Sequence, residues 1–348
     1  MILTIVVFSF LVVLHELAHL LAARFIGIGV VGFSLGFGPK LFSRVYRGTI
    51  YSLSVFLLGG YVRLLAEAGT SSRQASRPDW KPMSEATPWE KTIIYLAGPA
   101  ANLLAGITIF FVVAAIAGIP HPSTKIGSCV PDTPAARAGI MPGDRVAGVN
   151  GVSVQHWDQF TNQINLQMNN KEIEIKTVLL SLNRNGLLVY AELAPIKKGD
   201  LWVVGVRAAG EISLELLGII DAEAWSIKKS WDMVDDIGRF VGRLFSFRAK
   251  FAEMAGPMGI FEAGSGTARY GVGAYLVFVA TVSINLFVFN LLPFCPLDGG
   301  EITFAIYEAV FSKPPRPLFK KIISTAGIML FLSLFFIVVL NDFAKTLF

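Results

Sequence analysis

The feature that most limits how this chain can fold is a set of four long apolar stretches. They cover residues 2–23, 92–118, 272–292 and 322–340, and a helix needs about 20 apolar residues to cross a bilayer. The whole chain is 53% hydrophobic with a mean hydropathy of +0.59, too apolar for an ordinary soluble protein. The first stretch lacks the basic segment of a cleavable signal peptide. The sequence therefore predicts a polytopic α-helical membrane protein with four transmembrane helices.

The positions of the basic residues predict the orientation of these helices, because Lys and Arg concentrate in cytoplasmic loops. Basic residues gather between the first and second stretches and between the third and fourth, whereas the termini hold few. We therefore expect both termini, and the long segment between the second and third stretches, to lie outside the cytoplasm. The same distribution accounts for the pI of about 9.1, so no nucleic-acid partner is needed to explain it.

The first apolar stretch contains the motif His15-Glu16-Leu17-Ala18-His19. On a helix of about 3.6 residues per turn, the two histidines lie about 40° apart and Glu16 lies within about 100° of both. Two imidazoles at this spacing suit tetrahedral Zn²⁺, and the carboxylate is placed to take a proton from a zinc-bound water. Ionisable side chains inside a membrane helix are costly, which makes them functional candidates. A chance match, or two core histidines in a buried helix, is the alternative.

Two histidines leave a zinc site incomplete, and Asp298 is the best candidate for a third protein ligand. It follows the third apolar stretch and precedes two glycines that permit a close approach of the backbone. The predicted orientation puts His19 and Asp298 at the cytoplasmic ends of the first and third spans, and therefore at a similar depth. A helix C-cap is the alternative role for the segment around Asp298.

Composition divides the chain into eight consecutive segments. We expect transmembrane helices within 1–24, 92–118, 272–293 and 322–348, a cytoplasmic or membrane-associated β region with a loop at 25–91, an extracytoplasmic domain at 119–210, an amphipathic juxtamembrane helix region at 211–271 and a cytoplasmic loop at 294–321. A strand edge in the β region could accept an extended substrate by strand addition, and a plain connecting hairpin is an equal alternative. The amphipathic helix could lie on the outer membrane face or pack against the domain.

The domain at 119–210 has the pattern of a short helix, a Pro-Gly-Asp turn and two strands joined at Asn150-Gly151, a strong hairpin signal. Further strands are expected at 172–182, 187–193 and 202–206. This pattern resembles a PDZ domain, which is an α+β fold inserted between the helices. Its histidines, His121 and His156, are isolated in the sequence, and we expect them at surface or turn positions.

The two cysteines, Cys129 and Cys295, are predicted to lie in different compartments, so a disulfide between them is not expected. Cys295 lies near the presumed metal, and a thiolate is a good zinc ligand. A small buried side chain is the favoured interpretation, because free cysteines are so often buried.

Taken in order along the chain, these motifs resemble the bacterial site-2 proteases, which are zinc intramembrane metalloproteases of the sigma-factor-regulating type. The resemblance rests on H-E-x-x-H in the first span, Ala97-Gly-Pro-Ala-Ala-Asn102 in the second, one PDZ domain, and N-x-x-P…L-D-G-G at the third. It implies His15, His19 and Asp298 as zinc ligands, Glu16 as the general base and Asn290 as a holder of the substrate backbone. Two positions depart from the family pattern, since Cys295 stands where a proline is common and Glu301 where His or Arg is frequent.

The resemblance also implies a function. It predicts a zinc-dependent endopeptidase that cleaves single-span membrane proteins, such as anti-sigma factors or signal-peptide remnants, after a first protease has trimmed the outer domain. Its expected setting is the lipid bilayer of a bacterial inner membrane, with the PDZ domain outside and the active site toward the cytoplasm. A PDZ-based membrane scaffold with a vestigial metal site, and a zinc or ion transporter, are the alternatives from other classes.

Overall fold

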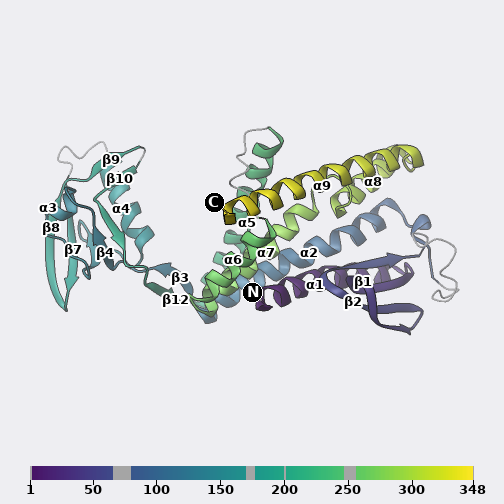
Figure 1. Ribbon diagram of the computed structural model, residues 1–348, viewed down its shortest axis with the longest axis horizontal. Helices are drawn as coiled ribbons and strands as arrows, with labels where there is room; N and C mark the ends of the chain where they lie inside the picture. Colours follow the sequence, from purple (N-terminus) through teal and green to yellow (C-terminus); the bar gives the residue numbers. More distant parts are fainter. Residues whose placement is uncertain (1, 66–79, 170–176, 200, 247–255, 348) are drawn as a thin grey trace. The chain divides into compact units, whose positions relative to one another are not determined.

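The computed structural model describes residues 2–65, 80–169, 177–199, 201–246 and 256–347 (Figure 1). The chain divides into two compact units. Unit 1 comprises Met1–Ala115 together with Gly218–Phe348, and unit 2 comprises Ile116–Leu217. Each unit has its own buried clusters of apolar side chains. Unit 2 is thus an insertion into unit 1.

The four predicted spans are confirmed as helices long and apolar enough to cross a membrane. They are α1 (Ile2–Ile26), α2 (Pro88–Val112) with its π-helical continuation η3 (Val113–Ala117), α7 (Val272–Asn290) and α9 (Pro317–Leu347). In the most apolar window of α9 only 6% of the residues are buried within the protein. Its apolar side chains therefore face outward, as in a helix surrounded by lipid.

Local sequence explains where α2 begins. The Thr87 hydroxyl accepts a hydrogen bond from the backbone N–H of Glu90, and the Glu90 carboxylate accepts one from the N–H of Thr87. This reciprocal capping box satisfies two N–H groups that would otherwise lack partners at the helix start. Pro88 occupies the first helical turn, where the missing N–H of proline costs nothing.

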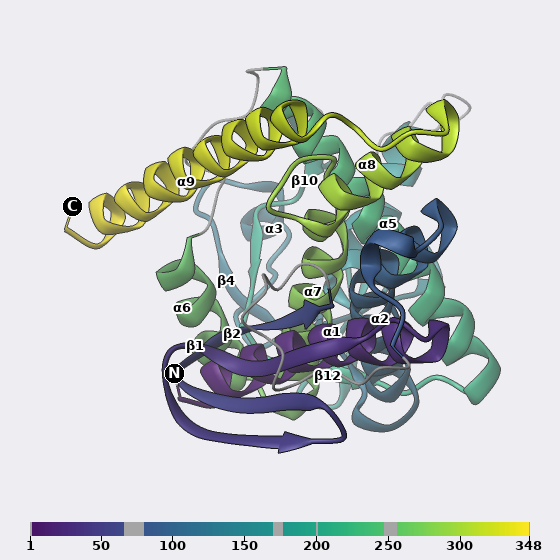
Figure 2. The same cartoon turned by 90° about the vertical axis from the view of Figure 1, so that its right-hand side faces the viewer.

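The expected β region is a long, folded-back hairpin of β1 (Val30–Tyr46) and β2 (Thr49–Leu64), which lies beside α1 (Figure 2). The first half of β1 pairs on one side with residues 50–53 of β2 and on the other with residues 60–64. Among the described residues, no strand pairs with the outer side of 60–63, so this segment is an edge.

Unit 1 has further helices, namely α5 (Ile219–Phe245), α6 (Pro257–Ala268), α8 (Asp298–Phe311) and the short 3₁₀ turn η2 (Met83–Glu85). One face of α5 packs through its aromatic and aliphatic side chains against α2 and α7. The prediction of a loop over all of 294–321 is wrong, because α8 occupies its centre. Asp298 lies in the first turn of α8, where a carboxylate is favoured by the helix dipole. The alternative of a C-cap at Asp298 is therefore wrong as well.

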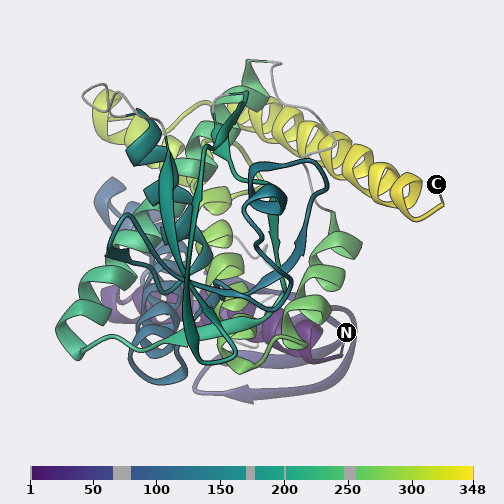
Figure 3. The same ribbon diagram turned by 90° about the vertical axis from the view of Figure 1, so that its left-hand side faces the viewer.

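Unit 2 is built on a four-stranded sheet in the order β6–β5–β7–β8 (Figure 3). Its strands are β5 (Arg145–Val149), β6 (Val152–Ser153), β7 (Val178–Arg184) and β8 (Leu187–Leu193). Helix α4 (Trp157–Asn169) presents Phe160, Ile164 and Met168 to the same core as the buried residues of β5 and β7. These three positions are spaced by four residues, so they lie on one helix face.

The remaining strands of unit 2 form three two-stranded pairs, and α3 (Pro134–Arg137) is a short helix among them. The pairs are β4 (Ile126–Cys129) with β11 (Val206–Ala208), β9 (Ile196–Lys198) with β10 (Leu201–Val203), and β3 (Ile119–Pro122) with β12 (Ile212–Glu215). The β3–β12 pair, here called the ribbon, holds the strands by which the chain enters and leaves unit 2.

The hairpin at Asn150-Gly151 and the strand at 187–193 are confirmed. The strand expected at 202–206 is divided between β10 and β11, because Gly205 adopts a φ of +90° that interrupts an extended strand. Residues 172–176 of the strand expected at 172–182 lie outside the described residues. The amphipathic helix expected in the region 211–271 starts at Ile219, because residues 212–215 are paired with β3 in the ribbon.

Candidate metal centre

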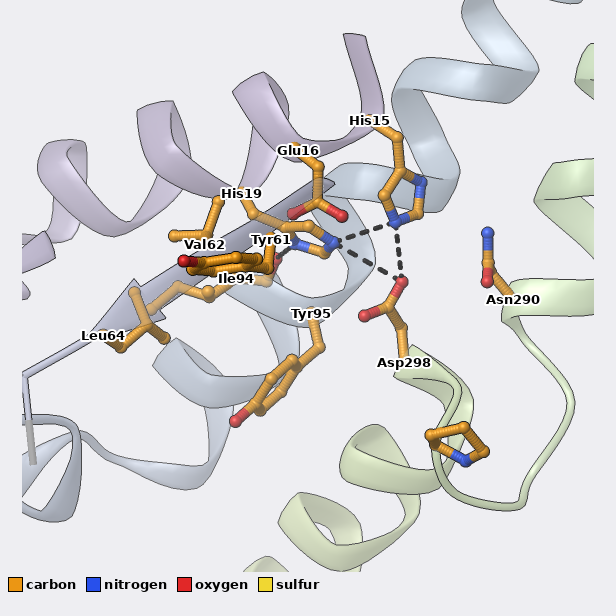
Figure 4. A pocket seen from close by; sticks show the side chains of 11 residues that line it. His15, Glu16, His19, Tyr61, Val62, Leu64, Ile94, Tyr95, Asn290 and Asp298 are labelled. Atoms are coloured by element: carbon orange, nitrogen blue, oxygen red, sulfur yellow. Dashed lines mark hydrogen bonds and ion pairs between the residues drawn. The ribbon is translucent and has the colours of Figure 1, made fainter. Parts of the chain in front are cut away.

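Helices from opposite ends of the chain bring three candidate ligands together (Figure 4). His15 and His19 lie on the same face of α1, as expected for residues four apart in a helix. Asp298 lies at the start of α8. Its Oδ2 atom is 3.1 Å from Nε2 of His15 and 3.4 Å from Nε2 of His19, and the two Nε2 atoms are 3.1 Å apart. Three potential ligand atoms thus converge on one point within unit 1.

The three separations fit a tetrahedral zinc ion. With Zn–N and Zn–O bonds of about 2.0–2.2 Å, neighbouring ligand atoms of a tetrahedron lie about 3.3–3.6 Å apart. The observed separations of 3.1–3.4 Å are close to this range. Both histidines are buried, each with 8% of its surface exposed. Little movement is therefore needed for the side chains to hold the ion.

The backbone of α2 orients the ring of His19. Nδ1 of His19 lies 2.7 Å from the carbonyl oxygen of Ile94. A carbonyl can only accept, so Nδ1 carries the proton and donates it, which leaves the lone pair of Nε2 free for a metal. The carbonyl thus selects the tautomer that a zinc ligand needs.

Asn102, also on α2, lies against the ring of His15. Its side chain is fully buried with Nδ2 3.1 Å from Nδ1 of His15, while its backbone carbonyl accepts a hydrogen bond from Ser283 of α7. The Oδ1 atom of Asn102 has no hydrogen-bond partner among the described residues. An amide turned so that Oδ1 accepts the Nδ1 proton of His15 satisfies that oxygen and frees Nε2 for a metal. Asn102 is therefore a positioning residue for His15.

Two glycines allow these elements to approach closely. A Cβ atom at Gly98 of α2 would overlap Nε2 of both His15 and His19. A Cβ atom at Gly300 would lie 2.6 Å from the backbone nitrogen of Cys295, so only glycine permits the tight turn that carries Asp298 to the site. The expectation that the glycines after Asp298 permit a close approach is confirmed.

A cavity of about 240 Å³ opens at the three candidate ligands. Glu16 and Asn290 both line it, as do residues of the β2 edge, of α2 and of the loop before α8: Tyr61, Val62, Leu64, Ile94, Tyr95 and Pro296. Glu16 also lies against the edge of β2, because a Cβ atom at Gly60 would be 3.1 Å from its Cγ. The cavity therefore joins the candidate ligands, the Glu16 carboxylate and a strand edge.

Some of these contacts were missed by sequence reasoning. The motif that includes Gly98 and Asn102 was recognised, but nothing in its residue types shows that it faces the histidines.

Cys295 is buried and contacts Glu301, with Sγ 4.0 Å from Oε1. Neither of the two His/Cys/Asp/Glu groups that could hold a metal within the described residues includes a cysteine. Both cysteines are free thiols.

Comparison with known proteins identifies the family. The model of peptidase family M50 matches residues 3–334. A relative from Rhizobium meliloti named as a zinc metalloprotease is 27% identical over 359 residues, covering 96% of this chain and 93% of that protein. One of the same description from Campylobacter jejuni is 29% identical over 353 residues, covering 98% and 92%. Because the family model spans almost the entire sequence, the chain belongs to peptidase family M50, the site-2 proteases, and is a membrane zinc metalloprotease whose cofactor is Zn²⁺.

Proposed function

We propose that His15, His19 and Asp298 hold the zinc ion and that the protein cleaves single-span membrane proteins at this site. The observation that carries the proposal is the convergence of two Nε2 atoms and one carboxylate oxygen within 3.4 Å of one another. When bound, Zn²⁺ acts as a Lewis acid that acidifies water and polarises a carbonyl. Two imidazoles and one carboxylate leave a fourth position open for this chemistry.

Glu16 is the proposed general base. It lines the same cavity as the three ligands but forms no part of their cluster. Its carboxylate takes a proton from the attacking water and returns it to the leaving amine when the peptide bond breaks. Glu16 faces the edge of β2, so the scissile bond is expected between that edge and the ligands.

The free edge of β2 is proposed to bind the substrate. A helical membrane segment must unwind before a protease can reach its peptide bonds, and unpaired backbone groups are costly in lipid. The N–H and C=O groups of residues 60–63 offer partners to the unwound segment by strand addition. Asn290 lines the other side of the cavity and is proposed to hold the substrate backbone there.

Unit 2 is proposed to be a PDZ domain that screens substrates. Its sheet order, the hairpin at Asn150-Gly151 and helix α4 agree with the motif found in the sequence. In this proposal a first protease removes the outer domain of the substrate, and unit 2 excludes untrimmed substrates or binds the new C-terminus. In this proposal unit 2 and both termini lie on the outer side of a bacterial inner membrane and the site lies toward the cytoplasm, which the distribution of basic residues supports.

Cleavage of a model single-span substrate in proteoliposomes tests this function. Mass spectrometry of the products is expected to locate the cut inside or at the edge of the substrate's apolar span. Replacing small residues near the cut by leucine should slow cleavage, because leucine favours the helix over the unwound strand. A chelator-treated sample is the control. A cut confined to the soluble flanks, at a rate insensitive to these substitutions, would contradict the proposal.

A further inference from the structure

Unit 2 contains a second convergence of histidine and carboxylate atoms. His121 lies on β3, Glu215 on β12, and His156 directly before α4. The Nε2 atoms of His121 and His156 each lie 3.2 Å from the same oxygen, Oε2 of Glu215. The expectation that the two histidines are isolated at surface or turn positions is therefore wrong, because the ribbon and the bridge between Ser123 and His156 bring them together.

From this geometry we infer that His121, His156 and Glu215 form a second metal site, which binds a divalent transition-metal ion such as Zn²⁺. The chain has four histidines, and all of them lie in one of the two clusters, each composed of two imidazoles and one carboxylate. Imidazole nitrogen suits Zn²⁺ and related transition metals, whereas Ca²⁺ and Mg²⁺ prefer sites made of oxygen.

The burial of the two histidine Nε2 atoms favours a metal ion bound between them. His156 has only 4% of its surface exposed. The Nε2 atoms of His121 and His156 are buried, and their shared contact with Oε2 of Glu215 lacks the geometry of a hydrogen bond. A buried nitrogen without a well-formed hydrogen bond carries a cost in folding free energy. A metal ion coordinated by both Nε2 atoms removes this cost.

A plain salt bridge explains the arrangement less well. The two rings stack with their centroids 4.1 Å apart and their planes 19° apart. If both rings were charged by pairing with Glu215, two imidazolium ions would repel each other face to face. A divalent cation binds both rings in the neutral form, with the carboxylate as the third ligand.

The groups behind the rings favour the tautomers that metal binding needs. The Ser213 hydroxyl donates to the carbonyl oxygen of His121 and lies 3.1 Å from Nδ1 of His156. Its proton is used on the carbonyl, so its oxygen accepts the Nδ1 proton of His156. Oδ1 of Asp158 lies 3.8 Å from Nδ1 of His121. Both Nδ1 atoms therefore face acceptors, which leaves both Nε2 lone pairs for the metal.

The second site would stabilise a junction rather than perform catalysis. Two of its ligands lie on the ribbon through which the chain enters and leaves unit 2, and the third lies at the start of α4. A metal ion there cross-links the ribbon to the body of unit 2. Its loss should loosen the ribbon first.

Metal content measured on the full chain tests the inference, with an affinity tag that contains no histidine. After equilibration at buffered micromolar free Zn²⁺ in detergent, elemental analysis is expected to give two Zn²⁺ per wild-type chain. His15→Ala/His19→Ala should retain one, His121→Asn/His156→Asn should also retain one, and the fourfold variant should retain none. Glu215→Gln should lose the second ion. Glu211→Gln is the matched control, since Glu211 lies four residues earlier in the chain and pairs with Lys125 and Arg145.

Co²⁺ distinguishes a built site from a loosely attached ion and also controls for misfolding. The His15→Ala/His19→Ala protein with Co²⁺ should show the visible absorption of a tetrahedral nitrogen–oxygen site. Adding His156→Asn should abolish this absorption. Hydrogen exchange of the unit 2 sheet should stay unchanged, which shows that the variant is folded. One Zn²⁺ per wild-type chain and none in His15→Ala/His19→Ala would overturn the inference. Two Zn²⁺ in a folded Glu215→Gln variant would do so too. Neither result bears on the proposed proteolytic site.

Discussion

Nε2 of His15 lies 3.1 Å from Oδ2 of Asp298, although the first residue belongs to the first helix of the chain and the second begins α8. The contact joins the middle of α1 to the first turn of α8, the helix that follows α7. Counting basic residues predicts that α1 and α7 run in the same direction, which puts His19 and Asp298 at a similar depth. The candidate metal centre and the membrane topology are therefore mutually consistent.

Asn102→Leu should weaken zinc binding without removing a ligand. The substitution deletes the group that orients His15 through Nδ1, and changes to such outer partners commonly lower metal affinity or activity about 10–100-fold. Competition with a chelator measures the zinc affinity. The His121→Asn/His156→Asn background leaves only the centre at His15, His19 and Asp298 to compete for the ion. Asn285→Leu on α7 is the matched control, because the Asn285 amide donates to the carbonyl oxygen of Thr281 in its own helix. Equal affinities for the two variants would contradict the role of Asn102.

In a His121→Asn/His156→Asn background, Gly98→Ala should abolish zinc binding at the candidate metal centre of unit 1 while leaving the membrane helices intact. The added methyl group would occupy the space beside the Nε2 atoms of His15 and His19. Helix α2 cannot easily move away, because it packs against both α1 and α7. Zinc content and circular dichroism of the purified protein measure the two effects. Gly238→Ala, at an open helical position, should change neither. A Gly98→Ala protein with full zinc occupancy would show that this close approach is not required.

The Asp144–Arg184 pair should stabilise unit 2 in a pH-dependent way. Asp144 is 1% exposed, and both of its oxygens lie 2.8 Å from the Arg184 guanidinium. The Arg184 hydrogen bonds hold the pKa of Asp144 below its usual value. The unfolded-state pKa is about 3.9, so the stabilisation is complete above it and is lost as the pH falls through the lower folded-state pKa.

Asp144→Asn should therefore lower the free energy of unfolding of unit 2 by about 2 kcal/mol at about pH 7, and the difference should shrink below about pH 4. Hydrogen exchange of the β5 and β7 amides in the full chain measures it. Asp236→Asn, in an exposed pair with Arg239, should have a much smaller effect. A pH-independent difference would mean that Asp144 acts through packing alone.

Sequence alone was sufficient where the signal is local or is set by the membrane. The spacing of His15 and His19 predicts a shared helix face, and the length of the apolar stretches predicts the spans. Asp298 was predicted because a carboxylate at the end of an apolar span needs a partner, and charge counting, which places it at the depth of His19, supported the prediction. These inferences need no knowledge of how the helices pack.

Other features depend on packing and could not be read from residue types. The contact of Asn102 with His15 depends on the rotation of α2 against α1. His121 and His156 meet because residue 123 pairs with residue 156, and Glu215 joins them because β3 pairs with β12, which lies far along the chain. Helix α8 was missed because its first residues include two glycines, which in the sequence indicate a loop rather than a close approach to Cys295.

The account's central claim is that Glu16 performs the proton transfer beside a zinc ion that it does not itself hold. Glu16→Gln keeps the size of the side chain and removes its basicity. Zinc content and cleavage of a single-span substrate, measured on the same preparation, test the claim directly. The account predicts unchanged zinc content and a cleavage rate lowered by about 10²–10⁴-fold, the usual contribution of a general base. Cleavage by Glu16→Gln at the wild-type rate, or loss of zinc in step with activity, would contradict it.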